Sequence, residues 1–335
     1  MPETAALCKS LPRIGIARAA FAERIPFSRL PVMVHIIDTL QLQRAKIIAV
    51  TVLESTDGLV LFDCGPESTF DNVVAGMKAI GLPVEDVHHV FLSHIHFDHA
   101  GAAWRLAEKG ATLYVHPRGA PHLINPAKLV ESATRIYGDN MGRLWGRLAA
   151  VSEAQVRIAN DGDVFTAGQF QIRATDTPGH ANHHNVYQWD DNVFGGDVAG
   201  VTINGGPPIP PFVPPELNIE SWQQSLDKLR AMKAARFYLP HYGLVEGGIG
   251  AHLDAVQERL HRWSTWFRDQ LRAGKTEAEL IPLFAKYEAD DLQSGGSNPD
   301  VVKDYEYADP SFMAVTSSIR YWQKFHPDQI GMTAR

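Results

Sequence analysis

Four side chains that can bind a metal ion lie within six positions of the sequence: His94, His96, Asp98 and His99. His94 and His96 are two residues apart, so on an extended backbone they point to the same side. Asp98 and His99 follow where the chain is expected to turn into a helix, so they can face a second point. Imidazole nitrogens and carboxylate oxygens are ligands of zinc and similar divalent metals. The stretch therefore predicts a metal site that suits two ions better than one.

Three more candidate ligands follow apolar, strand-like segments later in the chain. His180 comes after Thr-Pro-Gly, Asp197 after Gly-Gly, and His241 after Leu-Pro. Active sites of α/β proteins are built from loops at strand ends, so these positions suit a shared site. Each residue alone is equally compatible with a structural role, but together with the histidine-rich stretch they complete a ligand set.

In this order, the motif His94-x-His96-x-Asp98-His99 and the three later residues resemble the metallo-β-lactamase-fold hydrolase superfamily. The resemblance covers about residues 45–245 and is nearest to a glyoxalase II-like and lactonase-like subgroup, some members of which carry a helical C-terminal extension. It implies an α/β fold of the αβ/βα sandwich type, with two mixed β-sheets face to face and helices outside. A C-terminal helical extension would follow this sandwich.

The same resemblance implies a role for each residue. It assigns two groups of three ligands, one for each metal: His94, His96 and His180, and then Asp98, His99 and His241. Asp197 would bridge the two metals, and Asp63 in Leu-Phe-Asp63-Cys-Gly would hold a ligand in place without touching a metal. Asp98 would also be catalytic, since it can orient the attacking hydroxide and accept its proton.

The implied activity is that of a binuclear metal-dependent hydrolase, which uses a metal-bridging hydroxide to cleave a lactone, an ester or a thioester. Two divalent metal ions are expected as cofactors, zinc first, with iron or manganese as alternatives. No basic clamp for glutathione is evident, which favours a lactonase or esterase over glyoxalase II itself. Two alternatives stay open: a persulfide dioxygenase-like enzyme with one iron, and a sensing or interaction protein with vestigial hydrolase activity.

Composition limits the class of protein and its partners. The 335 residues carry a net charge of −7, which argues against a nucleic-acid partner. No apolar run reaches the ~18 residues of a membrane span. The two cysteines, Cys8 and Cys64, exclude a disulfide framework, and no signal peptide is visible, so a cytoplasmic protein with a small-molecule substrate is expected.

The hydrophobic pattern predicts the elements that position these side chains. Short runs rich in Val, Ile and aromatic residues predict strands over 32–37, 46–53, 59–62, 90–92, 112–115, 164–165, 169–174, 185–189, 193–194 and 235–239, with a further possible strand over 13–17. Helices are predicted over 68–80, 100–109, 216–232, 250–272, 276–288 and 309–325, and the segment 117–150 is predicted to be mainly helical. These elements divide the chain into a metal-hydrolase domain, 1–248, and a helical C-terminal extension, 249–335, which could mediate a homodimer.

Three features allow two interpretations each. The proline-rich loop over 203–215 is either part of the active site or a surface connection. The aromatic residues of this loop and of the C-terminal helices either line a hydrophobic pocket or form a helix-packing core: Phe212, Trp263, Trp266, Phe267, Tyr321 and Trp322. Three further histidines either line the pocket or have structural roles: His116, His183 and His184.

Overall fold

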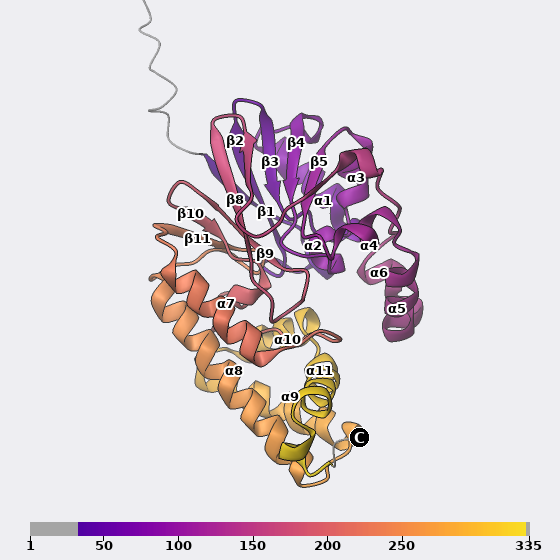
Figure 1. Cartoon of the computed structure of the whole chain (residues 1–335), viewed down its shortest axis with the longest axis vertical. Coiled ribbons are helices and arrows are strands. Elements are labelled where there is room, and N and C mark those ends of the chain that lie inside the picture. The colour runs from indigo at the N-terminus through magenta and orange to yellow at the C-terminus, as the bar shows by residue number, and fades with distance from the viewer. Residues whose placement is uncertain (1–32, 333–335) are drawn as a thin grey trace, which may run out of the picture. The chain divides into compact units, whose positions relative to one another are not determined.

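The computed structural model describes residues 33–332 (Figure 1). The possible strand over 13–17 lies outside these residues. Within the described part of the chain, no helix combines the length and the apolar character that crossing a bilayer requires.

Within residues 33–332, twelve strands form two six-stranded sheets. Sheet A contains, in spatial order, β1 (Val34–Asp38), β2 (Ala49–Ser55), β3 (Gly58–Phe62), β4 (Val87–Phe91), β5 (Thr112–Val115) and β6 (Val156–Ile158). Sheet B contains β12 (Gly243–Leu244), β11 (Arg236–Leu239), β10 (Asn192–Phe194), β9 (Asn185–Trp189), β8 (Phe170–Asp176) and β7 (Val164–Ala167). The predicted strands are present, and β6 and β12 are additional short strands that the hydrophobic pattern did not reveal.

Both sheets contain parallel and antiparallel pairs. In sheet A, β1 to β3 pair antiparallel, whereas β3 to β6 pair parallel. In sheet B, β10 and β11 pair parallel, and the other neighbours pair antiparallel. Parallel neighbours end at the same edge of a sheet, so loops that follow β3, β4 and β5 emerge together.

Aromatic side chains fill the space between the two sheets. Phe62 stacks on Phe91 within sheet A, with ring centroids 5.7 Å apart, and on Trp189 of sheet B at 4.5 Å. Val60 and Phe62 of β3 face sheet B, whereas Leu61 between them packs with the outer helices. Since both faces of β3 are buried, its sequence is a continuous apolar run.

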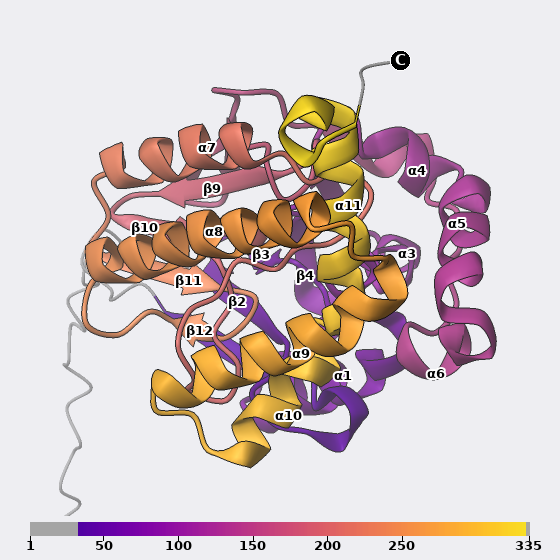
Figure 2. The ribbon, with the colours of Figure 1, turned by 90° about the horizontal axis from the view of Figure 1, so that it is seen from below.

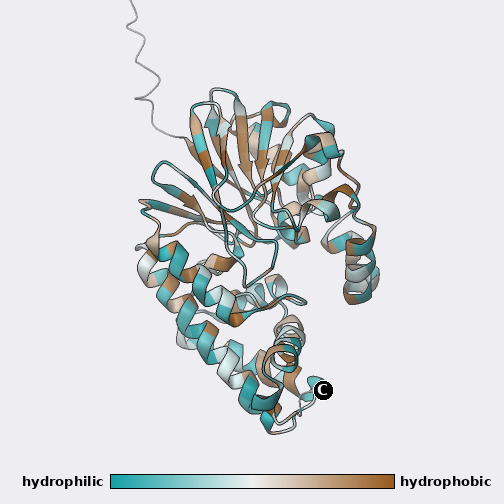
Figure 3. Cartoon of the chain, viewed as in Figure 1, coloured by the Kyte–Doolittle hydropathy of each residue, from teal (hydrophilic) through white to brown (hydrophobic). Residues whose placement is uncertain are grey.

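Helices cover the outer face of each sheet. Over sheet A, α1 (Phe70–Ala79) and α3 (Ala103–Glu108) share a hydrophobic core with β3 and β4. Over sheet B, α7 (Ile219–Ala231) and α8 (Ile249–Arg272) lie side by side and share a core with β10 and β11 (Figure 2). The strands are largely apolar, whereas α8 carries hydrophilic residues along its length (Figure 3). The αβ/βα sandwich prediction is confirmed.

The C-terminal part contains α8 and three further helices: α9 (Glu277–Ser294), α10 (Pro299–Ala308) and α11 (Ser311–Phe325). α9 continues to Ser294, beyond the predicted end at 288, and α10, which no predicted helix covers, begins at Pro299. The Asn298 side chain accepts hydrogen bonds from the backbone nitrogens of Asp300 and Val301, so Asn-Pro starts a helix here. The helical extension is present, whereas the domain boundary at 248 and the homodimer stay predictions.

The segment 117–150 is mainly helical, as predicted. It contains α4 (Ala120–Ile124), α5 (Ala127–Tyr137) and α6 (Met141–Leu144). Ala133 is the one buried residue of α5, so the helix is anchored by a single narrow face. This face borders the candidate functional site described below.

Candidate metal centre

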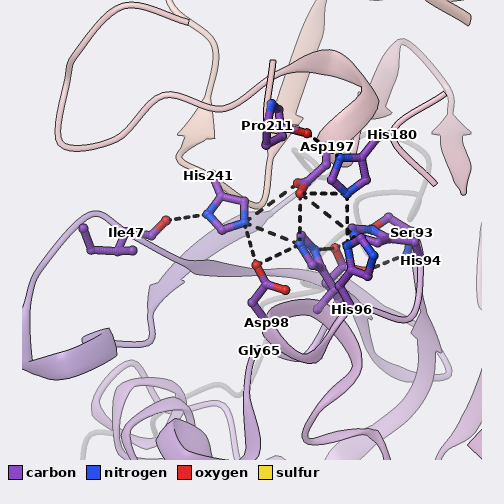
Figure 4. Close-up of polar contacts among 12 residues, drawn as sticks. Ile47, Gly65, Ser93, His94, His96, Asp98, His180, Asp197, Pro211 and His241 are labelled. Carbon is purple, nitrogen blue, oxygen red and sulfur yellow. Dashed lines mark hydrogen bonds and ion pairs between the residues drawn. The ribbon is translucent and has the colours of Figure 1, made fainter. Parts of the chain in front are cut away.

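The candidate ligands lie where strands of both sheets end. The segment after β4 carries His94 and leads into α2 (Phe97–Ala100), which holds two further candidates. In sheet B, His180 follows β8, Asp197 follows β10, and His241 follows β11. Figure 4 shows that the labelled side chains among them, such as Asp98, Asp197 and His241, point toward one another. The structure therefore brings together all seven predicted ligands: His94, His96, Asp98, His99, His180, Asp197 and His241.

Three histidines form the first group. The Nδ1 atom of His96 lies 2.9 Å from Nε2 of His94 and 3.1 Å from Nε2 of His180. Each of these short contacts can hold at most one proton between its two nitrogens. Three ring nitrogens that meet in this way direct lone pairs at one point, as zinc ligands do.

An aspartate and two histidines form the second group. Oδ2 of Asp98 lies 3.3 Å from Nε2 of His99 and 3.4 Å from Nε2 of His241. The two histidine nitrogens are 3.4 Å apart. These three atoms also converge, at a point on the other side of Asp197.

Asp197 lies between the two groups. Its Oδ2 is 3.6 Å from Nε2 of His180 in the first group and 3.3 Å from Nε2 of His99 in the second. Its Oδ1 is buried and has no hydrogen-bond partner among the described residues. A buried carboxylate oxygen without a partner is costly unless a cation binds it. The donor set therefore fits metal ions better than it fits a closed hydrogen-bond network.

Hydrogen bonds on the outer side of the rings fix which nitrogens face inward. Nδ1 of His180 donates to the carbonyl oxygen of Pro211 at 2.9 Å, and Nδ1 of His241 donates to that of Ile47 at 2.7 Å. Because Nδ1 carries the proton in both rings, Nε2 is left with a lone pair directed into the site. Pro211 lies in the proline-rich loop, which thereby takes part in the site.

Asp63, which follows β3, connects the two groups. Its Oδ2 accepts from Nδ1 of His99 at 2.8 Å and from Oγ of Ser93 at 2.7 Å. Because Ser93 donates to Asp63, its oxygen accepts from Nδ1 of His94, which is 3.0 Å away. One buried carboxylate thus orients a histidine of each group, as expected for a group that supports ligands from outside.

Burial and charge keep the first group neutral. Burial lowers the pKa of His94 well below its ordinary value, and the neighbouring His99 and His96 lower it further. Burial likewise lowers the pKa of His96. Neutral imidazoles are the form that binds metal, because the inward nitrogen keeps its lone pair.

The second group is dominated by carboxylates. Burial lowers the pKa of His99, but Asp197 and Asp98 hold it well above its ordinary value. Burial raises the pKa of Asp98, but the charges of His99 and the contact with His241 hold it well below its ordinary value. Ionised carboxylates at such a site, one buried and one partly exposed, create a strong local attraction for cations.

A cavity of about 430 Å³ opens onto Asp98, Asp197 and His241. Several elements that sequence reasoning did not connect with the site also line it: the segment 41–48, α5, and the connection between α10 and α11. The hydrophobic pattern of α5 signals an amphipathic helix, but it does not say what that helix packs against.

The features with two interpretations are now assigned. The proline-rich loop and His183 line the cavity. His184 bonds to Thr177 inside the protein, and His116 pairs with Asp176. The aromatic residues of the loop and the C-terminal helices lie outside this lining; Phe212, Trp263 and Phe267 are fully buried in the helical core.

Asp63→Asn should reduce metal affinity or activity by roughly 10–100-fold and leave the fold intact. The amide keeps the shape of the carboxylate but cannot accept from both His99 and Ser93 with equal strength. Competitive chelator titration and circular dichroism measure the two effects. Asp71→Asn, at a side chain that is 95% exposed, is the control. An Asp63→Asn protein with unchanged affinity would contradict the role of Asp63.

Gly179→Ala should disrupt the loop that carries His180. Gly179 has a φ of +144°, and an added Cβ would lie 2.3 Å from Cα of Trp222 in α7. Because the clash involves backbone, α7 or the loop must move, at a cost of about 1–3 kcal/mol in the free energy of unfolding. Urea denaturation measures this cost. Gly142→Ala, where an added Cβ has no neighbour within 4 Å, is the control. Equal free energies of unfolding for the two variants would exclude the proposal that Gly179 must be glycine to fit against Trp222.

Comparisons with known proteins agree with this geometry. The family model of the metallo-beta-lactamase superfamily matches residues 44–241. The metallo-beta-lactamase fold-containing protein ST1585 of Sulfurisphaera tokodaii is 28% identical over 188 residues, which are 54% of this chain and 71% of that protein.

Two solved structures are similar in fold. The archaeal superfamily protein ST1585 from Sulfolobus tokodaii has a TM-score of 0.57 and 26% identity, covering 69% of this chain and 85% of that one. The family protein TTHA1429 from Thermus thermophilus has a TM-score of 0.57 and 17% identity, covering 87% of this chain and 93% of that one. Members of the matched superfamily are mostly metal-dependent hydrolases. With the fold, the converging ligands and the family match in agreement, the chain belongs to the metallo-beta-lactamase superfamily.

Proposed function

We propose that this protein is a binuclear metal-dependent hydrolase that cleaves a lactone, an ester or a thioester. The observation that carries the proposal is the position of Asp197, whose carboxylate lies within 4 Å of ring nitrogens from both ligand groups. A carboxylate placed in this way can bridge two metal ions. A single-iron dioxygenase needs only one group of ligands, so the paired arrangement favours the binuclear hydrolase.

The ligand atoms would be divided between two metals. The first would take the ring nitrogens of His94, His96 and His180, and the second would take those of His99 and His241 with the Asp98 carboxylate. Nitrogen and oxygen donors suit zinc, and also iron or manganese. Cys64 is not a ligand, because it is buried and its Sγ donates to the carbonyl oxygen of His99 at 3.1 Å.

When bound, such a metal pair lowers the pKa of water toward neutrality and polarises a substrate carbonyl. The chain must then orient the water, hold the substrate and exclude bulk solvent. The ligand carboxylate of Asp98 borders the cavity, and its side chain is 20% exposed. Its pKa is held low by His99, so it is an ionised acceptor that orients the attacking water by a hydrogen bond and can take up its proton.

The cavity lining supports an ester, lactone or thioester with an apolar body. Its walls include Ile48, which directly precedes β2, Val201 and Ile203 from the loop after β10, and Met313 from α11. Burying apolar surface provides most of the binding energy in such a pocket, while a few polar groups set orientation.

The test is hydrolysis by metal-depleted and reconstituted protein on a panel of neutral lactones, esters and thioesters. Activity should be absent after chelation and return with added zinc. Asp197→Ala should lose metal affinity and activity together, by more than about 100-fold. Removing a metal ligand costs more than removing a residue that only orients a ligand, such as Asp63. Asp254→Ala, at an exposed position on α8, is the matched control. Full hydrolytic activity in the chelated protein would refute the proposal.

A further inference from the structure

One carboxyl group in the cavity has no structural role that the described residues reveal. Asp309 follows α10, is 5% exposed, and lines the same cavity as Asp98 and Asp197. Its Oδ1 atom is buried and has no hydrogen-bond partner within residues 33–332. Leaving a buried polar group unpaired is unfavourable, so a partner from outside the chain would offset this cost.

Two neighbouring acidic side chains, unlike Asp309, have a hydrogen-bond partner within the described part of the protein. Oγ of Ser311 donates to Oε2 of Glu306 in α10 at 2.6 Å, and it lies 3.2 Å from Oε2 of Glu288 in α9. They therefore hold the start of α11 in place. The helix end at Asp309 is closed by its backbone nitrogen, which donates to the carbonyl oxygen of Tyr305 at 2.8 Å. The Asp309 side chain is not needed for that bond.

The surroundings of Asp309 favour its uncharged form. Burial is the largest cause that raises its pKa well above the ordinary value, and the charges of Glu288, Asp197, Glu306 and Asp98 raise it further. An uncharged carboxyl group can donate one hydrogen bond and accept another. It suits a neutral polar group on a ligand, because a ligand carboxylate at Asp309 would meet the charges of Asp197, Glu306 and Asp98. The basic Lys128 and Arg143 line other parts of the cavity, on α5 and α6.

We propose that Asp309 is a specificity-determining residue, which hydrogen-bonds an uncharged hydroxyl or carbonyl group on the body of a largely apolar ester or lactone. The inference rests on the proposed hydrolase function for the identity of the scissile bond. Because Asp309 lies between α10 and α11, the proposal gives the C-terminal helical region a direct role in substrate selection.

The first test compares three para-nitrophenyl esters of similar length. The heptanoate ends in a methyl group, the omega-hydroxyhexanoate ends in a hydroxyl group of similar size, and the adipate monoester ends in a carboxylate. The wild-type enzyme should have the highest kcat/KM for the hydroxyl ester and the lowest for the adipate. One neutral hydrogen bond predicts about a threefold to tenfold preference for hydroxyl over methyl. A preference for adipate would overturn the proposal.

Variants then connect this preference to Asp309. In Asp309→Leu the ratio of kcat/KM between hydroxyl and methyl esters should fall to about one, mainly through KM. Asp309→Asn should keep most of the ratio, since an amide also donates and accepts. Asp300→Asn removes an acid whose side chain is 87% exposed on the same helix, and it is the control. An unchanged ratio in Asp309→Leu would overturn the proposal.

Thermal unfolding separates a binding role from a structural one. If Asp309 serves the substrate, Asp309→Leu removes an unpaired buried polar group, and Tm should rise by a few degrees. A structural role predicts a lower Tm, and a fall in Tm together with an unchanged substrate ratio would contradict the assignment.

Binding of uncleavable ligands to the protein as purified keeps this test independent of hydrolysis. The para-nitrophenyl ethers of heptanol and of a hydroxyl-terminated hexanol cannot be cleaved, and calorimetry measures their affinity. The hydroxyl ether should bind more tightly to the wild type, but not to Asp309→Leu. If none of the esters is hydrolysed, the proposed function fails. The affinities of the two ethers still test whether Asp309 binds a hydroxyl group. Equal binding of both ethers, or of neither, would overturn the proposal.

Discussion

The structure depends on how a buried carboxylate, Asp197, is compensated. It lies among ring nitrogens of four histidines, its Oδ2 is 3.3 Å from Nε2 of His99, and its Oδ1 has no hydrogen-bond partner among the described residues. A buried charge is tolerated only when it is paired or bound to metal. The inward nitrogens of His180 and His241 cannot donate to it while their protons point outward to carbonyl groups. While these two rings are neutral, metal cations would satisfy both the carboxylate and the inward lone pairs of the rings.

The sandwich fold provides this convergence because strand ends from both sheets meet at one edge. Sheet A contributes Asp63 and the histidine-rich segment, and sheet B contributes the remaining ligands. The aromatic layer that includes Phe62 and Trp189 fixes the spacing between the sheets. Asp63 then couples a histidine from each ligand group. The positions of the ligands are thus set by core packing and by one shared acceptor.

Sequence reasoning identified the seven side chains that converge in the structure because their signals are local. His94 to His99 are contiguous, and His180, Asp197 and His241 each follow a recognisable strand. The residues that line the cavity could not be predicted from the sequence in the same way. Asp309 and α5 line the cavity only because amphipathic helices pack on particular faces, and a hydrophobic pattern does not identify the packing partner. The helix α10 lies outside the predicted helices, although Asn298 and Pro299 are a pair that can start a helix.

The most direct measurement of the central claim is the number of metal ions per chain in protein purified without chelators or nickel affinity columns. Elemental analysis combined with anomalous scattering from crystals gives both the count and the positions. Two ions are predicted, one beside His94, His96 and His180 and the other beside Asp98, His99 and His241, with Asp197 between them. A single iron in the first group would contradict the binuclear hydrolase, and no metal after reconstitution would contradict the ligand assignment itself.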